Sequence, residues 1–209
     1  MAQPTPADEP GHGRSTSGAD YAQRLRRLDE SRWRRVLNVQ APYRWNIRRL
    51  HLGRTLDVGC GLGRNLVHLD GNGVGVDHNA ESIRIARERG LTAFTPDEFL
   101  ASDECRPESF DSIILAHVVE HLSESFASEL LSDYLPYLKP GGLVCLITPQ
   151  ERGYASDATH VTFTDFDKLA ALCAQLGLAE VRHYSFPFPR AVGKLFTYNE
   201  FVMVAKKST

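Results

Sequence analysis

The sequence predicts an α/β fold, in which a parallel sheet carries helices on both faces. From Thr55 onward, short apolar runs rich in β-branched residues alternate with segments long enough to form helices, a pattern typical of β-α-β units. A glycine-rich turn, G-C-G-L-G, directly follows the first of these runs. The length of 209 residues suits one such domain with a short appendage.

The chain before this pattern is expected to form a tail and an N-terminal helical lid. The first 18 residues are rich in Pro, Gly, Ser and Thr, which predicts a disordered tail. Residues 19–40 place apolar side chains at helical spacing, and Ala41-Pro42 predicts a break before a short helix over residues 43–50. The sequence thus predicts three parts: the tail (1–18), the lid (19–52) and the main domain (53–209).

Within the main domain, the strands are short runs of Val, Ile, Leu and Thr, separated by longer mixed segments. The stretch Lys139-Pro140-Gly141-Gly142 is a turn signal that ends one helix and begins the next strand. The expected strands span residues 55–59, 73–77, 92–94, 112–116, 143–148, 180–186 and 197–205. The expected helices span residues 64–68, 80–89, 96–101, 123–138 and 164–176.

Composition favours a cytoplasmic protein. No stretch of 18 apolar residues is present, and the first 20 residues contain no apolar segment of the kind found in a secretory signal. We therefore expect no membrane insertion. The four cysteines are far apart and form no C-x-x-C pair, so we expect reduced thiols rather than disulfides or a zinc knuckle.

Charge is distributed unevenly along the chain, although the net charge is only −2. Residues 1–54 contain 11 arginines, no lysine and 5 acids, whereas the remainder contains 13 basic and 21 acidic residues. An arginine-rich segment would suit contact with nucleic acid or an anionic substrate. The arginines of this segment are mixed with apolar residues at helical spacing, however, and this pattern favours the solvated face of an amphipathic helix.

The glycine-rich turn is typical of a nucleotide-like ligand. Gly59 and Gly61 allow a sharp reversal of the chain and a close approach of a ligand to the backbone. Asp77 follows Asp57 by 20 residues, at the end of the next expected strand, where an acid can accept both ribose hydroxyls of an adenosine group.

The spacing of the glycines distinguishes between two such ligands. A dinucleotide fingerprint requires G-x-G-x-x-G, but its third glycine is replaced here by Arg64, and the last glycine is Gly63. Asp57, which leads the turn, suits a ligand that carries an ammonium group. These residues favour an adenosyl amino acid over a nicotinamide dinucleotide.

Four ordered motifs resemble those of class I S-adenosylmethionine-dependent methyltransferases. They are L-D-V-G-C-G-L-G-R-N-L, G-V-G-V-D-H-N-A-E-S-I, F-D-S-I-I-L-A-H-V-V-E-H-L and L-K-P-G-G-L-V-C-L-I-T-P, which lie within residues 54–149. The resemblance implies a Rossmann-like, seven-stranded sheet with an antiparallel last strand. It also implies that S-adenosylmethionine is the methyl donor.

The resemblance further implies a set of residues that bind the cofactor. The methionine end would contact Asp57, Gly59, Gly61 and Gly63, whereas Asp77 would bind the ribose and His78 would lie beside the adenine; Ala116 completes the set. The acid that binds the adenine amine is less clear. Asp97 is the first choice and Glu98 the second, but Thr95 with an early acid also fits a capped helix start at Pro96.

The acceptor end is expected after the fourth strand, where H-V-V-E-H-L follows. Ligands of open α/β sheets lie outside the carboxyl ends of the strands, so His117 is a candidate for the catalytic base or for orienting the acceptor. His160, in the loop after the fifth strand, is the second catalytic candidate. Glu120 and His121 are expected to fix the loop that follows.

A metal site is an alternative for the same residues. His117, Glu120 and His121, together with His160, resemble the metal-dependent small-RNA 3′-terminal 2′-O-methyltransferases. That family has glutamate at the place of His117, and the loss of a hard oxygen ligand disfavours magnesium. We therefore expect no metal.

The sequence favours a metal-independent methyltransferase that acts on oxygen or nitrogen of a small molecule. The alternatives are a metal-dependent RNA methyltransferase, a non-catalytic S-adenosylmethionine binder and, least favoured, a nicotinamide oxidoreductase. The lid is expected to supply acceptor contacts or to pack on the sheet edge, through Tyr43, Arg44, Trp45 and Asn46. The acceptor's identity and the oligomeric state do not follow from the sequence.

Overall fold

The computed structural model describes residues 40–208. The expected tail and nearly all of the first lid helix therefore lie outside the described residues. Within the described part, 17 elements run from helix α3 (Ala41–Arg48) to strand β7 (Glu200–Lys207). No helix in residues 40–208 is long and apolar enough to cross a membrane.

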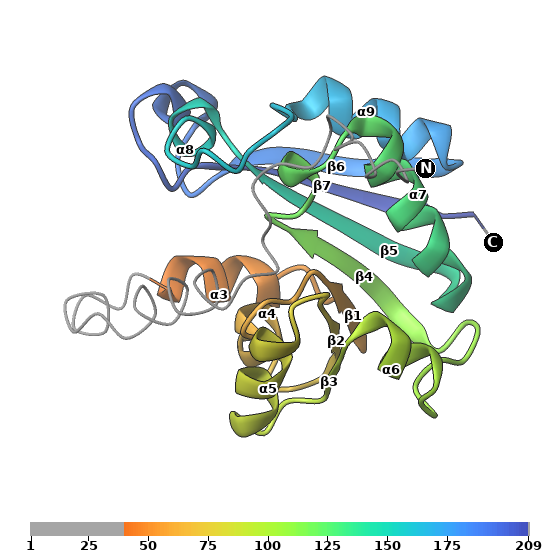
Figure 1. Cartoon of the computed structure of the whole chain (residues 1–209). Coiled ribbons are helices and arrows are strands. Elements are labelled where there is room, and N and C mark those ends of the chain that lie inside the picture. Colours follow the sequence, from red (N-terminus) through yellow and green to blue (C-terminus); the bar gives the residue numbers. More distant parts are fainter. Residues whose placement is uncertain (1–39, 209) are drawn as a thin grey trace, which may run out of the picture.

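Seven strands form one sheet in the order β3-β2-β1-β4-β5-β7-β6 (Figure 1). Neighbouring strands from β3 to β5 are parallel, whereas β7 is antiparallel to both β5 and β6. This confirms the seven-stranded sheet with an antiparallel last strand. The first six strands are β1 (Thr55–Val58), β2 (Gly73–Val76), β3 (Ala93–Phe94), β4 (Phe110–Ala116), β5 (Leu138–Pro149) and β6 (Leu178–Phe186).

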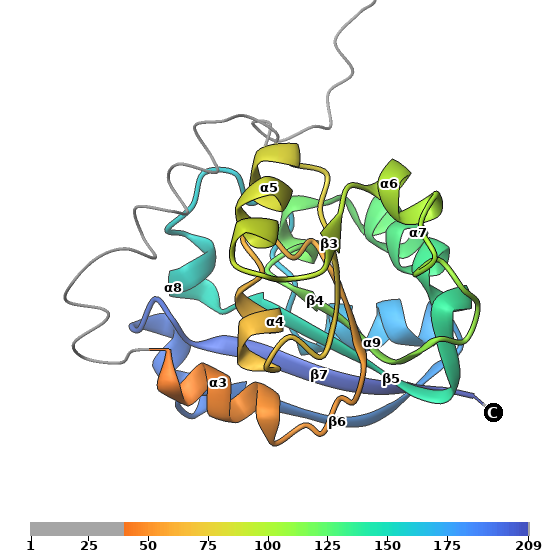
Figure 2. The same ribbon diagram turned by 90° about the horizontal axis from the view of Figure 1, so that it is seen from below.

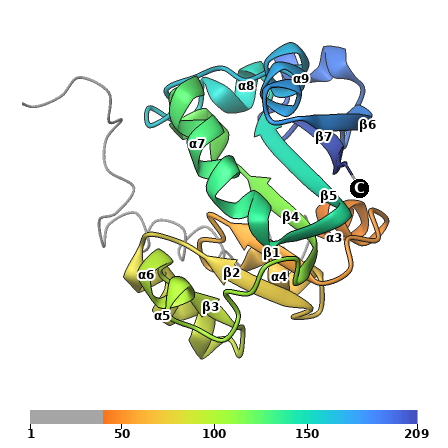
Figure 3. The same ribbon diagram turned by 90° about the vertical axis from the view of Figure 1, so that its right-hand side faces the viewer.

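Helices cover both faces of the sheet, as Figures 2 and 3 show from two sides. On one face, α3 lies beside α4 (Arg64–His68), and α5 (Ala80–Glu88) lies next to β3. On the other face lie α6 (Pro96–Leu100), α7 (Glu124–Tyr134) and α9 (Phe166–Gln175). Short elements join these layers: η1 (Val119–His121), η2 (Leu135–Tyr137), α8 (Glu151–Tyr154) and η3 (Arg190–Lys194).

Two larger apolar clusters hold the layers together, one on each face, and a third, smaller cluster joins the glycine-rich turn, α5 and β3. Alternate residues of β4 point to opposite sides, so Ile113 joins the cluster under α7 and α9, and Ile114 joins the cluster under α3. Both side chains are fully buried. Because both faces of the central strands are covered, β1 is buried along its whole length.

Two prolines move helix boundaries away from the predicted positions. The helix expected over residues 43–50 begins at Ala41 instead, because Pro42 lies in its first turn, where the missing N–H needs no partner. The α-helix expected to reach Leu138 ends at Tyr134, because Pro136 has no N–H to donate to the preceding turn, and the chain continues as the 3₁₀ helix η2. The turn signal at residues 139–142 then falls inside β5, where the pairing with β4 is irregular.

The last two strands also differ from the prediction at their ends. Strand β6 begins earlier than residue 180, and β7 begins later than residue 197. Between them, residues 187–199 form a connection that contains η3. All four cysteines are free, as expected.

Candidate functional site

Asp57 lies inside β1, next to the glycine-rich turn, and is 0% exposed. Its Oδ1 accepts a 3.4 Å hydrogen bond from Asn65 Nδ2, whereas Oδ2 has no hydrogen-bond partner among the described residues. Burial raises the pKa of Asp57 to about 7, against the opposing effects of Asn65 and Arg64. A buried oxygen without a partner costs free energy, so a cationic group placed here would be stabilised.

The three glycines of the turn all have positive φ angles, of 75° at Gly59, 52° at Gly61 and 77° at Gly63. An added Cβ would lie 2.3 Å from Val118 Cγ2 at Gly59 and 2.3 Å from a Leu91 methyl group at Gly63. From the sequence, Gly59 was expected to allow a ligand to approach the backbone. The structure adds a second reason, which is the packing of the turn against the chain's own side chains.

Asp77 joins the turn to the end of β2. Its Oδ2 accepts a 2.8 Å hydrogen bond from the Gly61 N–H, and its Oδ1 accepts one of 2.8 Å from the Asn79 N–H. Each carboxylate oxygen has a second lone pair, so the side chain can still accept hydroxyl groups. His78 follows with a side chain that is 55% exposed, and its Nδ1 lies 3.7 Å from Asp77 Oδ1.

The acids after β3 have different surroundings. Thr95 caps α6 in a capping box: Thr95 Oγ1 accepts from the Glu98 N–H, and Glu98 Oε2 accepts from the Thr95 N–H. Glu98 also pairs with Arg87, and these hydrogen bonds hold the pKa of Glu98 below its usual range. Glu98 therefore has a structural role. Asp97 as the adenine-binding acid stays a prediction.

His117 follows Ala116 at the end of β4, with a φ of 60° in the left-handed region. Its Nδ1 lies 3.2 Å from Glu120 Oε1, and its Nε2 lies 2.8 Å from Glu200 Oε1. Burial favours the neutral ring, but the two carboxylates outweigh this effect and raise the pKa of His117 to about 9. A ring that donates from both nitrogens has no lone pair for a proton, so this geometry favours an orienting role over that of a general base.

A small cavity of about 10 Å³ lies beside His117, between α3, α4 and the strand ends. This volume holds about one water molecule. The residues that line it include Tyr43, Arg64, Asn65, Ala116, His117 and Glu200. The cavity thus brings the helix after the glycine turn next to the end of β4.

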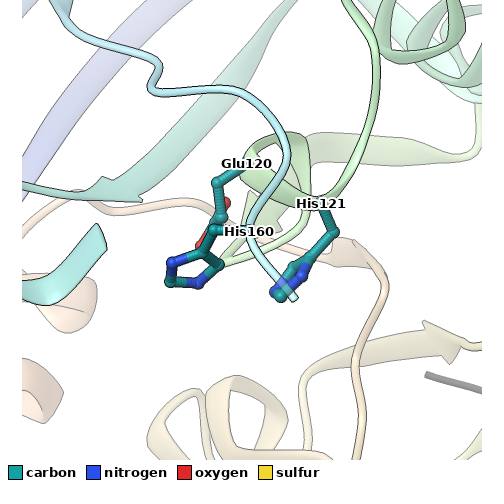
Figure 4. Close-up of side chains that lie close together, drawn as sticks. All are labelled: Glu120, His121 and His160. Atoms are coloured by element: carbon teal, nitrogen blue, oxygen red, sulfur yellow. The ribbon is translucent and has the colours of Figure 1, made fainter. Parts of the chain in front are cut away.

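Glu120, His121 and His160 lie together near the same end of the sheet (Figure 4). One potential ligand atom from each of the three residues lies within 4.8 Å of the others. His117 is not part of this group. The sequence placed all four residues in one candidate metal set, whereas the structure gathers three of them.

The lid residues of α3 have three kinds of surroundings. Asn46 is buried and accepts a 2.8 Å hydrogen bond from the Tyr184 hydroxyl, so it packs the helix on the sheet. Tyr43 lines the small cavity, and its hydroxyl donates to the Tyr198 carbonyl at 2.6 Å. Arg44 and Trp45 are exposed, although the Trp45 ring stacks on Phe186.

Two residues of this site, Glu200 and Asn65, were not predicted from the sequence. Glu200 contacts His117 from 83 positions away, and Asn65 contacts Asp57 from the first turn of α4. No local sequence feature identifies Glu200 as a site residue. Its position depends on the register of β7 against β5, where it pairs with Pro149. Asn65 could have been found from its position eight residues after Asp57, just behind the glycine-rich turn.

Comparison with protein families matches residues 20–206 to the family described as "Methyltransferase domain". No curated protein sequence matches the chain.

Solved structures of methyltransferases share the fold. A SAM-dependent methyltransferase from Archaeoglobus fulgidus has a TM-score of 0.63 and 21% identity, over 79% of this chain and 93% of that chain. A possible histamine N-methyltransferase from Thermotoga maritima has a TM-score of 0.66 and 18% identity, over 90% and 98% of the two chains. Magnesium protoporphyrin IX methyltransferase from Synechocystis PCC 6803, with bound SAH, has a TM-score of 0.65 and 14% identity, over 93% and 98%.

Proposed function

Because the chain belongs to the methyltransferase domain family, and is an S-adenosylmethionine-dependent enzyme as its motifs indicated, we propose that it methylates an oxygen or nitrogen atom of a small molecule. The observation that supports the site of methyl transfer is the meeting of three strand ends. Asp57 on β1, Asp77 after β2 and Ala116 on β4 all lie at the carboxyl edge of the parallel strands. This edge is where open α/β sheets bind ligands.

The residues at this edge fit S-adenosylmethionine. The unpartnered Oδ2 of Asp57 suits the ammonium group of the methionine end. Asp77, fixed by the Gly61 and Asn79 N–H groups, presents its remaining lone pairs to the ribose hydroxyls. We assign His78 and Asp97 to the adenine end on the resemblance alone.

S-adenosylmethionine supplies an electrophilic methyl group on a sulfonium, so the reaction needs no protein nucleophile. The protein's task is to hold the acceptor in line and to exclude water. His117, held between Glu120 and Glu200 at the end of β4, would orient the acceptor. His160 would contact the acceptor from the loop that precedes α9.

The charge of the full chain favours a small acceptor over RNA. The chain carries 24 lysine and arginine residues and 26 acidic residues, so it has no overall excess of positive charge. RNA binding depends on an excess of positive charge along the contact surface. The cytoplasmic location expected from the sequence stays a prediction.

The proposal is tested by titrating the full chain with S-adenosylhomocysteine in a calorimeter. We expect Asp77→Ala to weaken binding by about tenfold or more, which is about 1.4 kcal/mol, because the ribose loses its acceptor and the turn loses its anchor. The matched control is Asp133→Ala, an exposed acid on α7, which should bind as the wild type does. Unchanged affinity in a folded Asp77→Ala variant would contradict the ribose assignment.

A further inference from the structure

We propose that Glu120, His121 and His160 bind a divalent transition-metal ion of the Zn²⁺ type. The three residues come from two segments of the chain. Glu120 and His121 belong to η1, and His160 belongs to the loop between α8 and α9. The inference deepens the proposed function. The metal site itself does not depend on that function; only the role of the ion in binding an acceptor rests on it.

The geometry of the cluster is close to that of a metal site. The candidate ligand atoms lie within 4.8 Å of one another, and Figure 4 shows the three side chains gathered in one space between the two segments. Ligand atoms around a tetrahedral Zn²⁺ lie about 3.3 Å apart, given bond lengths of about 2.0–2.1 Å. The half-buried rings of His121 and His160 can close this difference by small rotations.

One oxygen of the buried Glu120 carboxylate has no hydrogen-bond partner among the described residues. Glu120 is 0% exposed, and its Oε1 contacts His117. The oxygen without such a partner in residues 40–208 is Oε2. A buried, unpartnered carboxylate oxygen is unfavourable, and a cation bound there would compensate for that cost.

Both histidines are oriented as metal ligands usually are. His121 Nδ1 lies 3.2 Å from the Thr159 carbonyl oxygen, and His160 Nδ1 lies 2.7 Å from the Tyr154 carbonyl oxygen. A carbonyl can only accept, so each Nδ1 carries the proton and each Nε2 keeps its lone pair. Hydrogen bonds of this kind fix the tautomer and orientation of metal-binding histidines.

The backbone holds the two segments in register. The Val161 and Thr162 N–H groups donate to the Glu120 carbonyl oxygen, at 2.8 and 3.0 Å. The Thr162 hydroxyl donates to the Leu122 carbonyl oxygen at 2.7 Å. Hydrogen bonds therefore fix the relative positions of the two segments that carry the cluster.

From the sequence we expected no metal, because His117 replaces a glutamate and this loss of an oxygen ligand disfavours magnesium. That objection still holds for magnesium, but it does not apply to an ion that prefers nitrogen ligands. Both nitrogens of His117 are engaged by Glu120 and Glu200, so this residue supports Glu120 from outside the cluster. Two imidazoles with one carboxylate suit Zn²⁺ and its neighbours among the transition metals, and disfavour Mg²⁺, which prefers oxygen ligands.

Three protein ligands leave at least one coordination position open, as in catalytic zinc sites. A water molecule or an acceptor oxygen could occupy that position. A bound hydroxyl loses its proton more readily. The site thus favours oxygen over nitrogen as the methylated atom of the proposed reaction.

The test uses the full chain after removal of metals with a chelator. Co²⁺ is titrated into the protein while its visible absorption is recorded, and Zn²⁺ is then added to displace it. We expect one Co²⁺ to bind per chain with bands typical of mixed nitrogen and oxygen ligation. His160→Asn and, separately, His121→Asn should weaken binding by at least about tenfold.

His183→Asn is the matched control, because His183 is an exposed histidine that pairs with Glu180 outside the cluster. It should bind Co²⁺ as the wild type does. The proposal is overturned if the wild type binds no stoichiometric Co²⁺, or if a folded histidine variant, His160→Asn or His121→Asn, binds it with unchanged affinity and spectrum. Using two histidine variants keeps the test decisive if one fails to fold.

The binding of S-adenosylhomocysteine is measured on the same samples. We expect both histidine variants to retain it, since neither residue lies at the glycine turn or at Asp77. Metal binding without S-adenosylhomocysteine binding in the wild type would contradict the proposed function and leave the metal site standing. The reverse result would remove the metal site alone.

Discussion

At the scale of single residues, Asp57 links the cofactor site to folding. Its pKa rises from 3.8 to about 7, mainly because burial disfavours the charged carboxylate. Between about pH 4 and pH 7, the folded protein therefore holds a proton on Asp57 that the unfolded chain releases. The stabilisation that this proton provides is complete below about pH 4 and is lost as the pH rises through about 7.

Asp57→Asn should remove this dependence, because an amide does not titrate over that range. Between about pH 4 and pH 8, the unfolding free energy of the ligand-free wild type should fall relative to that of the variant by up to about 4 kcal/mol. Urea unfolding of both proteins across this range measures the difference. Parallel pH profiles would show that Asp57 does not titrate as described.

At the scale of elements, the glycine turn is joined to η1 by direct packing. Gly59 has a φ of 75°, and an added Cβ would overlap Val118, which lies just before η1. Gly71 has a φ of 77°, but no atom lies within 4 Å of its added Cβ. The two positions thus share backbone strain and differ in packing.

Gly59→Ala should destabilise the protein more than Gly71→Ala does. The left-handed conformation costs about 1–2 kcal/mol in either variant, and overpacking against Val118 adds about 1–3 kcal/mol at Gly59. Thermal or urea unfolding of the two variants measures the difference. Equal losses would mean that Val118 moves aside without cost.

Several local features of the elements were predictable because their causes are local. The caps at Thr95 and Asp165 follow from side chains that accept from the next turn of their own helices. The helix boundaries near Pro42 and Pro136 differ from the prediction. The sequence does not show whether a proline lies in the first turn of a helix or follows the end of one. The contact between His117 and Glu200 could not be predicted, since it depends on the register of β7 in the sheet.

At the scale of the whole molecule, the motifs predicted both the sheet and the edge that carries the site. Parallel strands place their carboxyl ends together, so Asp57, Asp77 and Ala116 had to meet once the strands were recognised. The closeness of His160 to Glu120 and His121 was less predictable. It depends on a loop whose path is fixed by hydrogen bonds to the Glu120 carbonyl oxygen.

The central claim is that this edge of the sheet binds S-adenosylmethionine by its methionine end and its ribose. A crystal structure of the full chain with S-adenosylhomocysteine tests it most directly. We predict the ammonium group at Asp57 Oδ2 and the ribose hydroxyls at Asp77, with the sulfur facing the end of β4 at Ala116. Density for the ligand elsewhere on the molecule, or in this place with its two ends reversed, would contradict the account.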